Sequence, residues 1–142
     1  MIVPDINLLL YATVDGFSEH ERARTWWEEV LNGDEDVGLA AVALFGFIRL
    51  ATHPRVLDRP LAVGAAVDRV KEWLGCPQVR MLLPGPRHLE IAFQLFSKLG
   101  TGGNLTTDAQ LAALAIEHQA ELHSNDTDFA RFDGLRWVNP LN

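Results

Sequence analysis

Short apolar runs recur along the chain, and a longer segment with apolar residues at helical spacing follows most of them. Such compact, almost wholly apolar runs are typical of strands that are buried on both faces of a parallel sheet. On this pattern we expect strands at residues 2–5, 37–40 and 79–83, a short strand that begins at Leu122, and a last strand at 136–138.

The segments between these runs predict helices. One helix follows the first strand directly, from Asn7 through Tyr11, and the sequence Ser18-Glu19-His20-Glu21 has the form of a capping box at the start of the next helix. That second helix should end near Asn32-Gly33. Further helices are expected at 42–50, along the face formed by Ala62, Ala65, Ala66, Val70 and Trp73, at 87–99, and after a Thr107 cap, with Leu111, Leu114 and Ala115 on the apolar face.

Strands that alternate with helices in this way predict an α/β fold with a mostly parallel central sheet and helices on both faces. With 142 residues and 48% apolar content, the chain has the size and the core-forming residues of one ordinary domain, so we expect a single domain over residues 1–142. In folds of this class, ligands bind beyond the carboxyl ends of the strands. The residues that follow each strand are therefore the first candidates for chemistry.

Charge and cysteine content limit the function. The chain carries 12 Lys and Arg against 19 Asp and Glu, a formal net charge of -7. Bulk attraction to a polyanion or an anionic membrane cannot be the driving force, so any binding of nucleic acid must be local and assisted by cations. A single cysteine, Cys76, rules out an intrachain disulfide. No apolar run is long enough for a membrane span and no amino-terminal leader is visible, so we expect a soluble, cytoplasmic protein.

Carboxylates follow the predicted strands at separate places in the chain. Asp5 follows the first strand, Asp126 and Asp128 follow the strand at Leu122, and Asp108 lies in the first turn of the helix after Thr107. Carboxylates that are brought together either take up protons or bind a cation. At neutral pH a hard divalent ion is favoured, because Mg²⁺ prefers oxygen ligands and is typically held by one or two carboxylates. Mn²⁺ would also fit.

A metal ion held there could activate a water molecule and stabilise charge on a phosphodiester, which is how an acidic protein could cleave a polyanion. Asn7 could orient a metal-binding carboxylate or a water by a hydrogen bond, without contacting the metal itself. Thr107, Ser124 or Asn125 could do the same.

Three arginines, Arg49, Arg55 and Arg59, surround the segment Thr52-His53-Pro54. Their guanidinium groups could contact the phosphates of RNA. A solvated polar face would have the same sequence, so both interpretations stay open.

Three of these carboxylates also have a structural interpretation. Asp5 could be a strand-end turn residue, Asp108 could stabilise a helix start, and Asp128 could cap a short helix. The coincidence of their positions favours a shared site. A phosphotransfer domain with a phosphorylated Asp is a further alternative, but such domains usually need a lysine in the pocket, and neither Lys71 nor Lys98 follows a predicted strand.

Five segments occur in a characteristic order along essentially the whole chain: 2–9 (IVPDINLL), 47–56 (FIRLATHPRV), 107–115 (TDAQLAALA), 124–129 (SNDTDF) and 132–141 (FDGLRWVNPL). Together they resemble the PIN-domain ribonuclease toxins of the VapC type, and the last segment is similar to the end of a mycobacterial-style branch. Each segment alone is weak, but the ordered set is specific.

The resemblance implies a PIN-like three-layer α/β/α sandwich and a Mg²⁺- or Mn²⁺-dependent endoribonuclease, the toxin of a type II toxin–antitoxin system. It also implies a cognate VapB-type antitoxin that neutralises the toxin, a homodimer, and contact with DNA only through the antitoxin. The family's metal ligands correspond to Asp5 and Asp108, and Asp126 corresponds to a further catalytic acid.

One position departs from the family pattern. Many PIN domains carry a glutamate in the helix after the second strand, where this chain reads ALFGFIR over 43–49, with Gly46 nearest to the acidic position. Three acidic sites could suffice, another carboxylate could substitute, or activity could be reduced. The alternative function is therefore a degenerate PIN domain that binds RNA or the antitoxin without catalysis.

Overall fold

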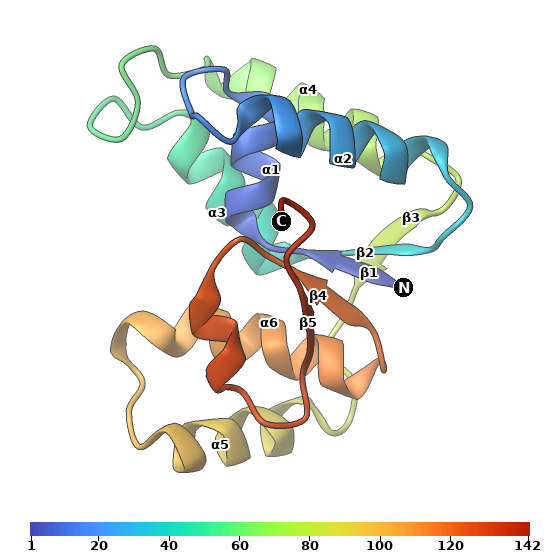
Figure 1. The fold of residues 1–142 in the computed structure, drawn as a ribbon, viewed down its shortest axis with the longest axis vertical. Helices are drawn as coiled ribbons and strands as arrows, with labels where there is room; N and C mark the ends of the chain where they lie inside the picture. The colour runs from blue at the N-terminus through green and yellow to red at the C-terminus, as the bar shows by residue number, and fades with distance from the viewer.

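Five parallel strands form one sheet at the centre of the computed structural model, which describes residues 1–142 (Figure 1). The strands are β1 (Ile2–Pro4), β2 (Val37–Ala40), β3 (Val79–Leu82), β4 (Glu121–His123) and β5 (Arg136–Val138). Their order across the sheet is β3-β2-β1-β4-β5. Every neighbouring pair is parallel, so all carboxyl ends open onto one edge of the sheet, as the sequence predicted.

Helices cover both faces of the sheet (Figure 1). On one face lie α1 (Ile6–Thr13), α2 (His20–Asn32), α3 (Ala41–Ala51) and α4 (Val63–Leu74). On the other lie α5 (His88–Leu99) and α6 (Thr106–Glu117). Two short 3-10 helices complete the chain, η1 (Gly103–Leu105) before α6 and η2 (Thr127–Arg131) after β4.

Two buried apolar clusters correspond to the two helical layers. A cluster of 17 residues includes Ile91 of α5 and Leu111 of α6, and a cluster of 16 includes Leu9 of α1, Trp27 of α2 and Trp73 of α4. Because the two clusters are almost equal in size, each helical layer has a core of its own against the sheet. The predicted three-layer α/β/α architecture is confirmed.

Two helix starts differ from the sequence prediction. The Ser18 hydroxyl bonds to the Glu19 carboxylate at 2.9 Å instead of capping α2, which begins at His20 after Glu19. Thr107 lies inside the first turn of α6 and caps nothing, because η1 leads directly into that helix. The 3-10 turn supplies carbonyl acceptors to the first N–H groups, so no side-chain cap is needed there.

The apolar face of α4 is narrower than predicted. Ala66, Val70 and Trp73 are buried, but Ala62 precedes the helix and Ala65 is exposed. The remaining predicted bounds agree with the structure to within about two residues. Every helix is too short or too polar to cross a membrane.

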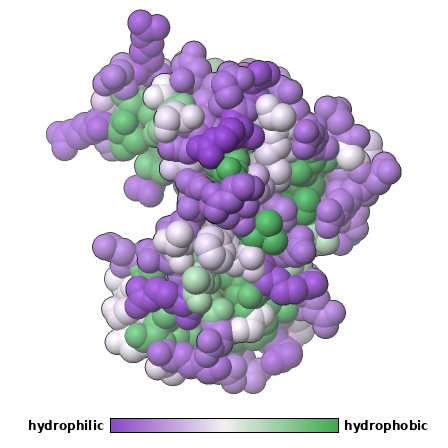
Figure 2. All heavy atoms as spheres, viewed as in Figure 1, coloured by the Kyte–Doolittle hydropathy of each residue, from purple (hydrophilic) through white to green (hydrophobic).

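Polar side chains cover most of the face drawn in Figure 2, and the outline is notched on the left between the two helical layers. Figure 1 shows that β1 runs from the N terminus toward this side and that the segment before α6 lies there. The notch therefore lies at the carboxyl edge of the sheet, where the sequence predicted the site.

Candidate active site

Asp5 lies at the junction of β1 and α1. It is the N-cap residue of α1, and its Oδ1 accepts the N–H of Ile6 at 2.7 Å. Its Oδ2 accepts the hydroxyl proton of Ser124, also at 2.7 Å. Burial raises the pKa of Asp5, against the lowering effect of these two hydrogen bonds, and the neighbouring Asp126 raises it further. The carboxylate is thus held in one orientation in a place that disfavours its charge.

Asp108 reaches the same place from the first turn of α6. A helix start favours negative charge, which would lower the pKa of a carboxyl there. Burial, followed by the charges of Asp5, Asp126 and Asp128, instead raises the pKa of Asp108 to about 7. The neighbouring carboxylates and the loss of solvent outweigh the helix, so the four acids share one electrostatic site.

Asp126 lies between β4 and η2, and Asp128 is the second residue of η2. Carboxylate oxygens of Asp108, Asp126 and Asp128 all lie within 4.8 Å of one another. The Asp126 Oδ1 accepts the N–H of Asp128 at 2.9 Å, so Asp126 is the N-cap residue of η2. The capping role suggested for Asp128 is therefore wrong, since it belongs to Asp126. Asp128 is exposed, and its carboxylate accepts no hydrogen bond from the protein.

Ser124 is fully buried and connects the acids to Asn7. Its hydroxyl has one proton, which it donates to Asp5, so it accepts from the N–H of Asp126 at 3.0 Å and from Asn7 Nδ2 at 3.4 Å. This arrangement orients the Asn7 amide and leaves its Oδ1 buried without a partner. Buried amide oxygens usually have a hydrogen-bond partner, so the Asn7 Oδ1 is an unsatisfied acceptor that shares Ser124 with Asp5 and could serve a cation.

The four carboxylates are suited to a hard cation. All the donors are oxygens, and none of the four acids forms an ion pair with a basic side chain. A divalent ion would offset their mutual repulsion. The structure thus brings together Asp5, Asp108, Asp126 and Asp128, the four acids that the sequence analysis named as candidates. Their catalytic and metal-binding roles stay predictions.

Only some of the other candidate residues line the hollow next to the acidic site. Thr107 and Arg49 line a hollow of about 250 Å³ together with Ile6, the residue that follows Asp5. Arg55 is exposed in the turn after α3 and does not line this hollow. Its N–H donates to the ring of His53 at 3.1 Å. Of the three arginines considered as phosphate contacts, only Arg49 lines this hollow, and Arg59 lines the cavity between α2 and α4 instead.

Sequence reasoning missed Tyr11. This residue is half-buried on α1, where burial and then the charges of Glu19, Asp5 and Asp126 raise its pKa. Its phenol therefore stays a neutral hydrogen-bond donor close to the acids. Tyr11 follows Asn7 by four residues, and residues four apart share a helix face. That spacing was a signal in the sequence.

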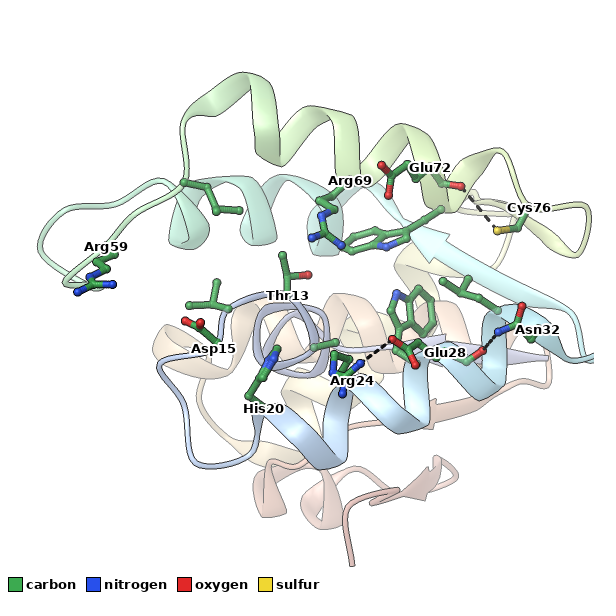
Figure 3. A pocket seen from close by; sticks show the side chains of 16 residues that line it. Thr13, Asp15, His20, Arg24, Glu28, Asn32, Arg59, Arg69, Glu72 and Cys76 are labelled. Atoms are coloured by element: carbon green, nitrogen blue, oxygen red, sulfur yellow. Dashed lines mark hydrogen bonds and ion pairs between the residues drawn. The ribbon is translucent and has the colours of Figure 1, made fainter.

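A larger cavity lies elsewhere, between α2 and α4 (Figure 3). It measures about 670 Å³, and the indoles of Trp27 and Trp73 contribute to its apolar wall. Charged side chains such as Arg24, Glu28 and Arg69 surround it in the figure. None of the four acids lines it, so it is a surface separate from the acidic site.

Comparison with known proteins agrees with this geometry. The model of the PIN domain family matches residues 2–135. The chain belongs to the PIN-domain family. This PIN domain is 57% identical over 141 residues to Ribonuclease VapC33 of Mycobacterium tuberculosis, with 99% of both chains covered. It is 42% identical to Ribonuclease VapC37 of the same species, over 99% of this chain and 97% of the relative. The resemblance to VapC proteins seen in the sequence is confirmed.

Solved structures show the same PIN fold at low sequence identity. The structure of VapBC2 from Rickettsia felis, bound to a DNA fragment from its promoter, superposes with a TM-score of 0.71 at 16% identity and covers 98% of both chains. VapC20 of Mycobacterium tuberculosis, described as a toxin that cleaves the sarcin-ricin loop, superposes with a TM-score of 0.70 at 18% identity, over 96% of this chain and 99% of that one. These similarities establish the architecture.

Proposed function

We propose that this PIN domain is a metal-dependent endoribonuclease and the toxin of a toxin–antitoxin pair. The observation that carries the proposal is the meeting of Asp5, Asp108, Asp126 and Asp128 at one edge of the sheet, from three distant parts of the sequence. The 57% identity to a protein named Ribonuclease VapC33 supports the choice of RNA as substrate. An enzyme that cleaves cellular RNA would act in the cytoplasm.

The residues at the site fit a divalent cation. Asp108 has a pKa raised to about 7, so its carboxylate is unstable as an anion without positive charge nearby. The unpartnered Asn7 Oδ1 adds a neutral oxygen beside Asp5. Asp5 and Asp108 would hold Mg²⁺, or Mn²⁺ in its place. When bound, the ion supplies the positive charge that activates an attacking water and stabilises the phosphodiester in the transition state.

The chain's own residues then have separate tasks. Ser124 fixes the orientation of Asp5 through the 2.7 Å hydrogen bond, and Asn7 supports Ser124. Asp126 is the further acid that orients ligand or water, with Asp128 beside it. Thr107 and Arg49 line the hollow of about 250 Å³ next to Ile6, and Arg49 offers a cation to a phosphate.

The test is cleavage of RNA by wild-type protein and by Asp5→Asn and Asp108→Asn variants, with Mg²⁺ and with a chelator. We expect either substitution, or the chelator, to lower the rate by at least about 100-fold, since each removes a charge that holds the ion. Asp34→Asn, an exposed position before β2, is the matched control and should cleave normally. Undiminished cleavage by an Asp5 or Asp108 variant would disprove the assigned roles.

We also propose a VapB-type antitoxin as the partner, with DNA contacted only through it and the toxin as a homodimer. VapBC complexes among the structures of similar fold support this pairing. The cavity between α2 and α4, with Trp27 and Trp73 in its wall and charges around it, has the chemistry to receive an amphipathic helix (Figure 3). A basic side chain from the same antitoxin could neutralise the acids at the sheet edge. Co-purification with the product of an adjacent reading frame tests the pairing.

One observation favours the alternative of a binding module without catalysis. Gly46 stands where many PIN domains carry a glutamate, and a Cβ there would lie 2.5 Å from Ile6 Cδ1. A side chain at this position would therefore require the Ile6 side chain to move. Binding of RNA and Mn²⁺ by wild-type protein, with no cleavage of any RNA, would support this alternative.

A further inference from the structure

A hollow of about 250 Å³ adjoins the acidic site on the side of α3. Its lining residues are Ile6, Val42, Phe45, Gly46, Arg49 and Thr107. The four residues from α3 are three and four positions apart, so they share one face of that helix. Ile6 follows Asp5, and Thr107 precedes Asp108. The hollow is therefore the immediate neighbour of the acids that we assign to catalysis.

Gly46 shapes the floor of this hollow. A Cβ at this position would lie 2.5 Å from Ile6 Cδ1 and 3.0 Å from Ile6 Cγ1. The glycine therefore allows α3 to approach the start of α1, and it leaves no side chain above the floor. No carboxylate lines the hollow, in contrast to the acidic cluster beside it.

Phe45 and Arg49 are exposed at this hollow. The Phe45 side chain is 71% exposed, although phenylalanine is usually buried. Arg49 is exposed as well and forms no ion pair. Phe45 and Arg49 are four residues apart on a helix, so the ring and the cation are neighbours. An aromatic ring beside a cation is the combination with which proteins bind single-stranded nucleic acid.

We propose that this hollow binds one unpaired nucleotide of the RNA substrate, with the base stacked on Phe45 and a phosphate held by Arg49. The proposal rests on the ribonuclease function proposed above and deepens it. The volume is below the roughly 300–1,000 Å³ of pockets that enclose a drug-sized ligand, so it suits a single base. Because every base has a ring face, stacking here would select for an unpaired strand and would tolerate different sequences.

A second copy of the chain fits this face less well. If the hollows of two copies faced each other, the Arg49 guanidinium would be covered, and no carboxylate of the second hollow could pair with it. An RNA strand brings phosphates that match this charge. Continuity with the acidic site also favours the strand on which that site would act.

The test measures binding of a fluorescein-labelled single-stranded RNA by anisotropy, with every variant combined with Asp108→Asn so that the RNA stays intact. We expect Phe45→Ala to weaken binding by about 5- to 100-fold and Phe45→Trp to restore it, because the loss is that of one stacked base. Phe93→Ala is the matched control: Phe93 is 59% exposed on α5, outside the hollow, and its loss should leave the affinity unchanged. An abasic nucleotide at the stacked position should abolish the difference in affinity between the protein that retains Phe45 and the Phe45→Ala variant.

The outcomes separate this proposal from the proposed function. In the catalytically intact background, Phe45→Ala should raise KM with little change in kcat. If wild-type protein cleaves RNA but Phe45→Ala alters neither affinity nor KM, the subsite is wrong and the ribonuclease stands. If wild-type protein cleaves nothing but Phe45→Ala still weakens binding, the subsite stands and catalysis is wrong. If Phe45→Ala converts a dimer to a monomer without loss of RNA affinity, the face binds a second copy of the chain and the proposal is wrong.

Discussion

Ser124 Oγ lies 2.7 Å from Asp5 Oδ2, and this bond joins two residues that are 119 positions apart in the sequence. The register of the sheet explains the meeting, because Pro4 of β1 pairs with His123 of β4 and the next residue of each strand emerges at the same edge. The N–H of Asp5 also donates to the carbonyl of His123 at 2.9 Å. The parallel pairing of β1 and β4 is thus what assembles the acidic site.

We predict that Ser124→Ala lowers both activity and stability. The change removes the donor to Asp5 and the acceptor for the N–H of Asp126, so both groups lose a buried partner. The free energy of unfolding should fall by about 1–3 kcal/mol, and cleavage by about 10- to 100-fold. Urea denaturation and an RNA cleavage assay measure the two effects. Ser18→Ala, which removes only an exposed bond to Glu19, is the control, and an equal loss there would contradict the assignment.

We predict that Asp108→Asn stabilises the metal-free protein and weakens its response to Mg²⁺. In a chelator the variant should be more stable than wild type by about 1–2 kcal/mol at pH 8, because it removes one charge from a half-buried cluster of like charges; solvent screening keeps the gain this small. Added Mg²⁺ should raise the melting temperature of wild type but much less that of the variant, since a ligand stabilises only the form that binds it. An equal Mg²⁺ response in both proteins would argue against Asp108 as a ligand.

The architecture followed from the sequence because the signals for its elements are local. Apolar runs marked all five strands, and the strand–helix alternation fixed the parallel sheet that brings Asp5 and Asp126 to one edge. The strand-end positions of these acids were therefore enough to predict their convergence.

Side-chain detail did not follow, because it depends on contacts between distant segments. The sequence Ser18-Glu19-His20-Glu21 fits a capping box, but only the fold shows that the Ser18 hydroxyl donates to the Glu19 carboxylate. The unpartnered oxygen of Asn7 likewise results from Ser124, whose single proton is already donated to Asp5. The exposure of Phe45 could not be predicted either, because an apolar residue in a helix is expected to be buried.

Gly46→Ala should have opposite effects in two backgrounds. In the wild-type protein its methyl group must displace the end of the Ile6 side chain, 2.5 Å away, and this cost should exceed the gain of about 1 kcal/mol in helix propensity. In an Ile6→Ala background the obstacle is gone, and Gly46→Ala should stabilise. A double-mutant cycle in urea should therefore give a coupling of about 1–2 kcal/mol. Additive effects would mean that Ile6 is not what requires a glycine here.

Glu117 holds the segment before α5 against the end of α6, and this contact predicts a dependence on pH. Its carboxylate accepts the N–H groups of Gly85 and Arg87, both at 2.8 Å. Burial tends to raise the pKa of Glu117, but these two hydrogen bonds and the nearby histidines together lower it below the usual 4.5. A lowered pKa means that the ionised form stabilises the fold above about pH 4.5, and that this contribution is lost as the pH falls through the lowered pKa.

Glu117→Gln should therefore reduce the free energy of unfolding by about 0.5–1 kcal/mol at pH 7, with a smaller difference from wild type at pH 3. Urea denaturation of both proteins across this range measures the difference in their free energies of unfolding. The other carboxylates contribute equally to both proteins, so their contributions cancel in this difference. Glu72→Gln is the control, because that exposed side chain accepts no hydrogen bond from the protein and should show no such trend. A difference for Glu117→Gln that stays constant from pH 7 to pH 3 would mean that the charge of the carboxylate contributes nothing to the contact.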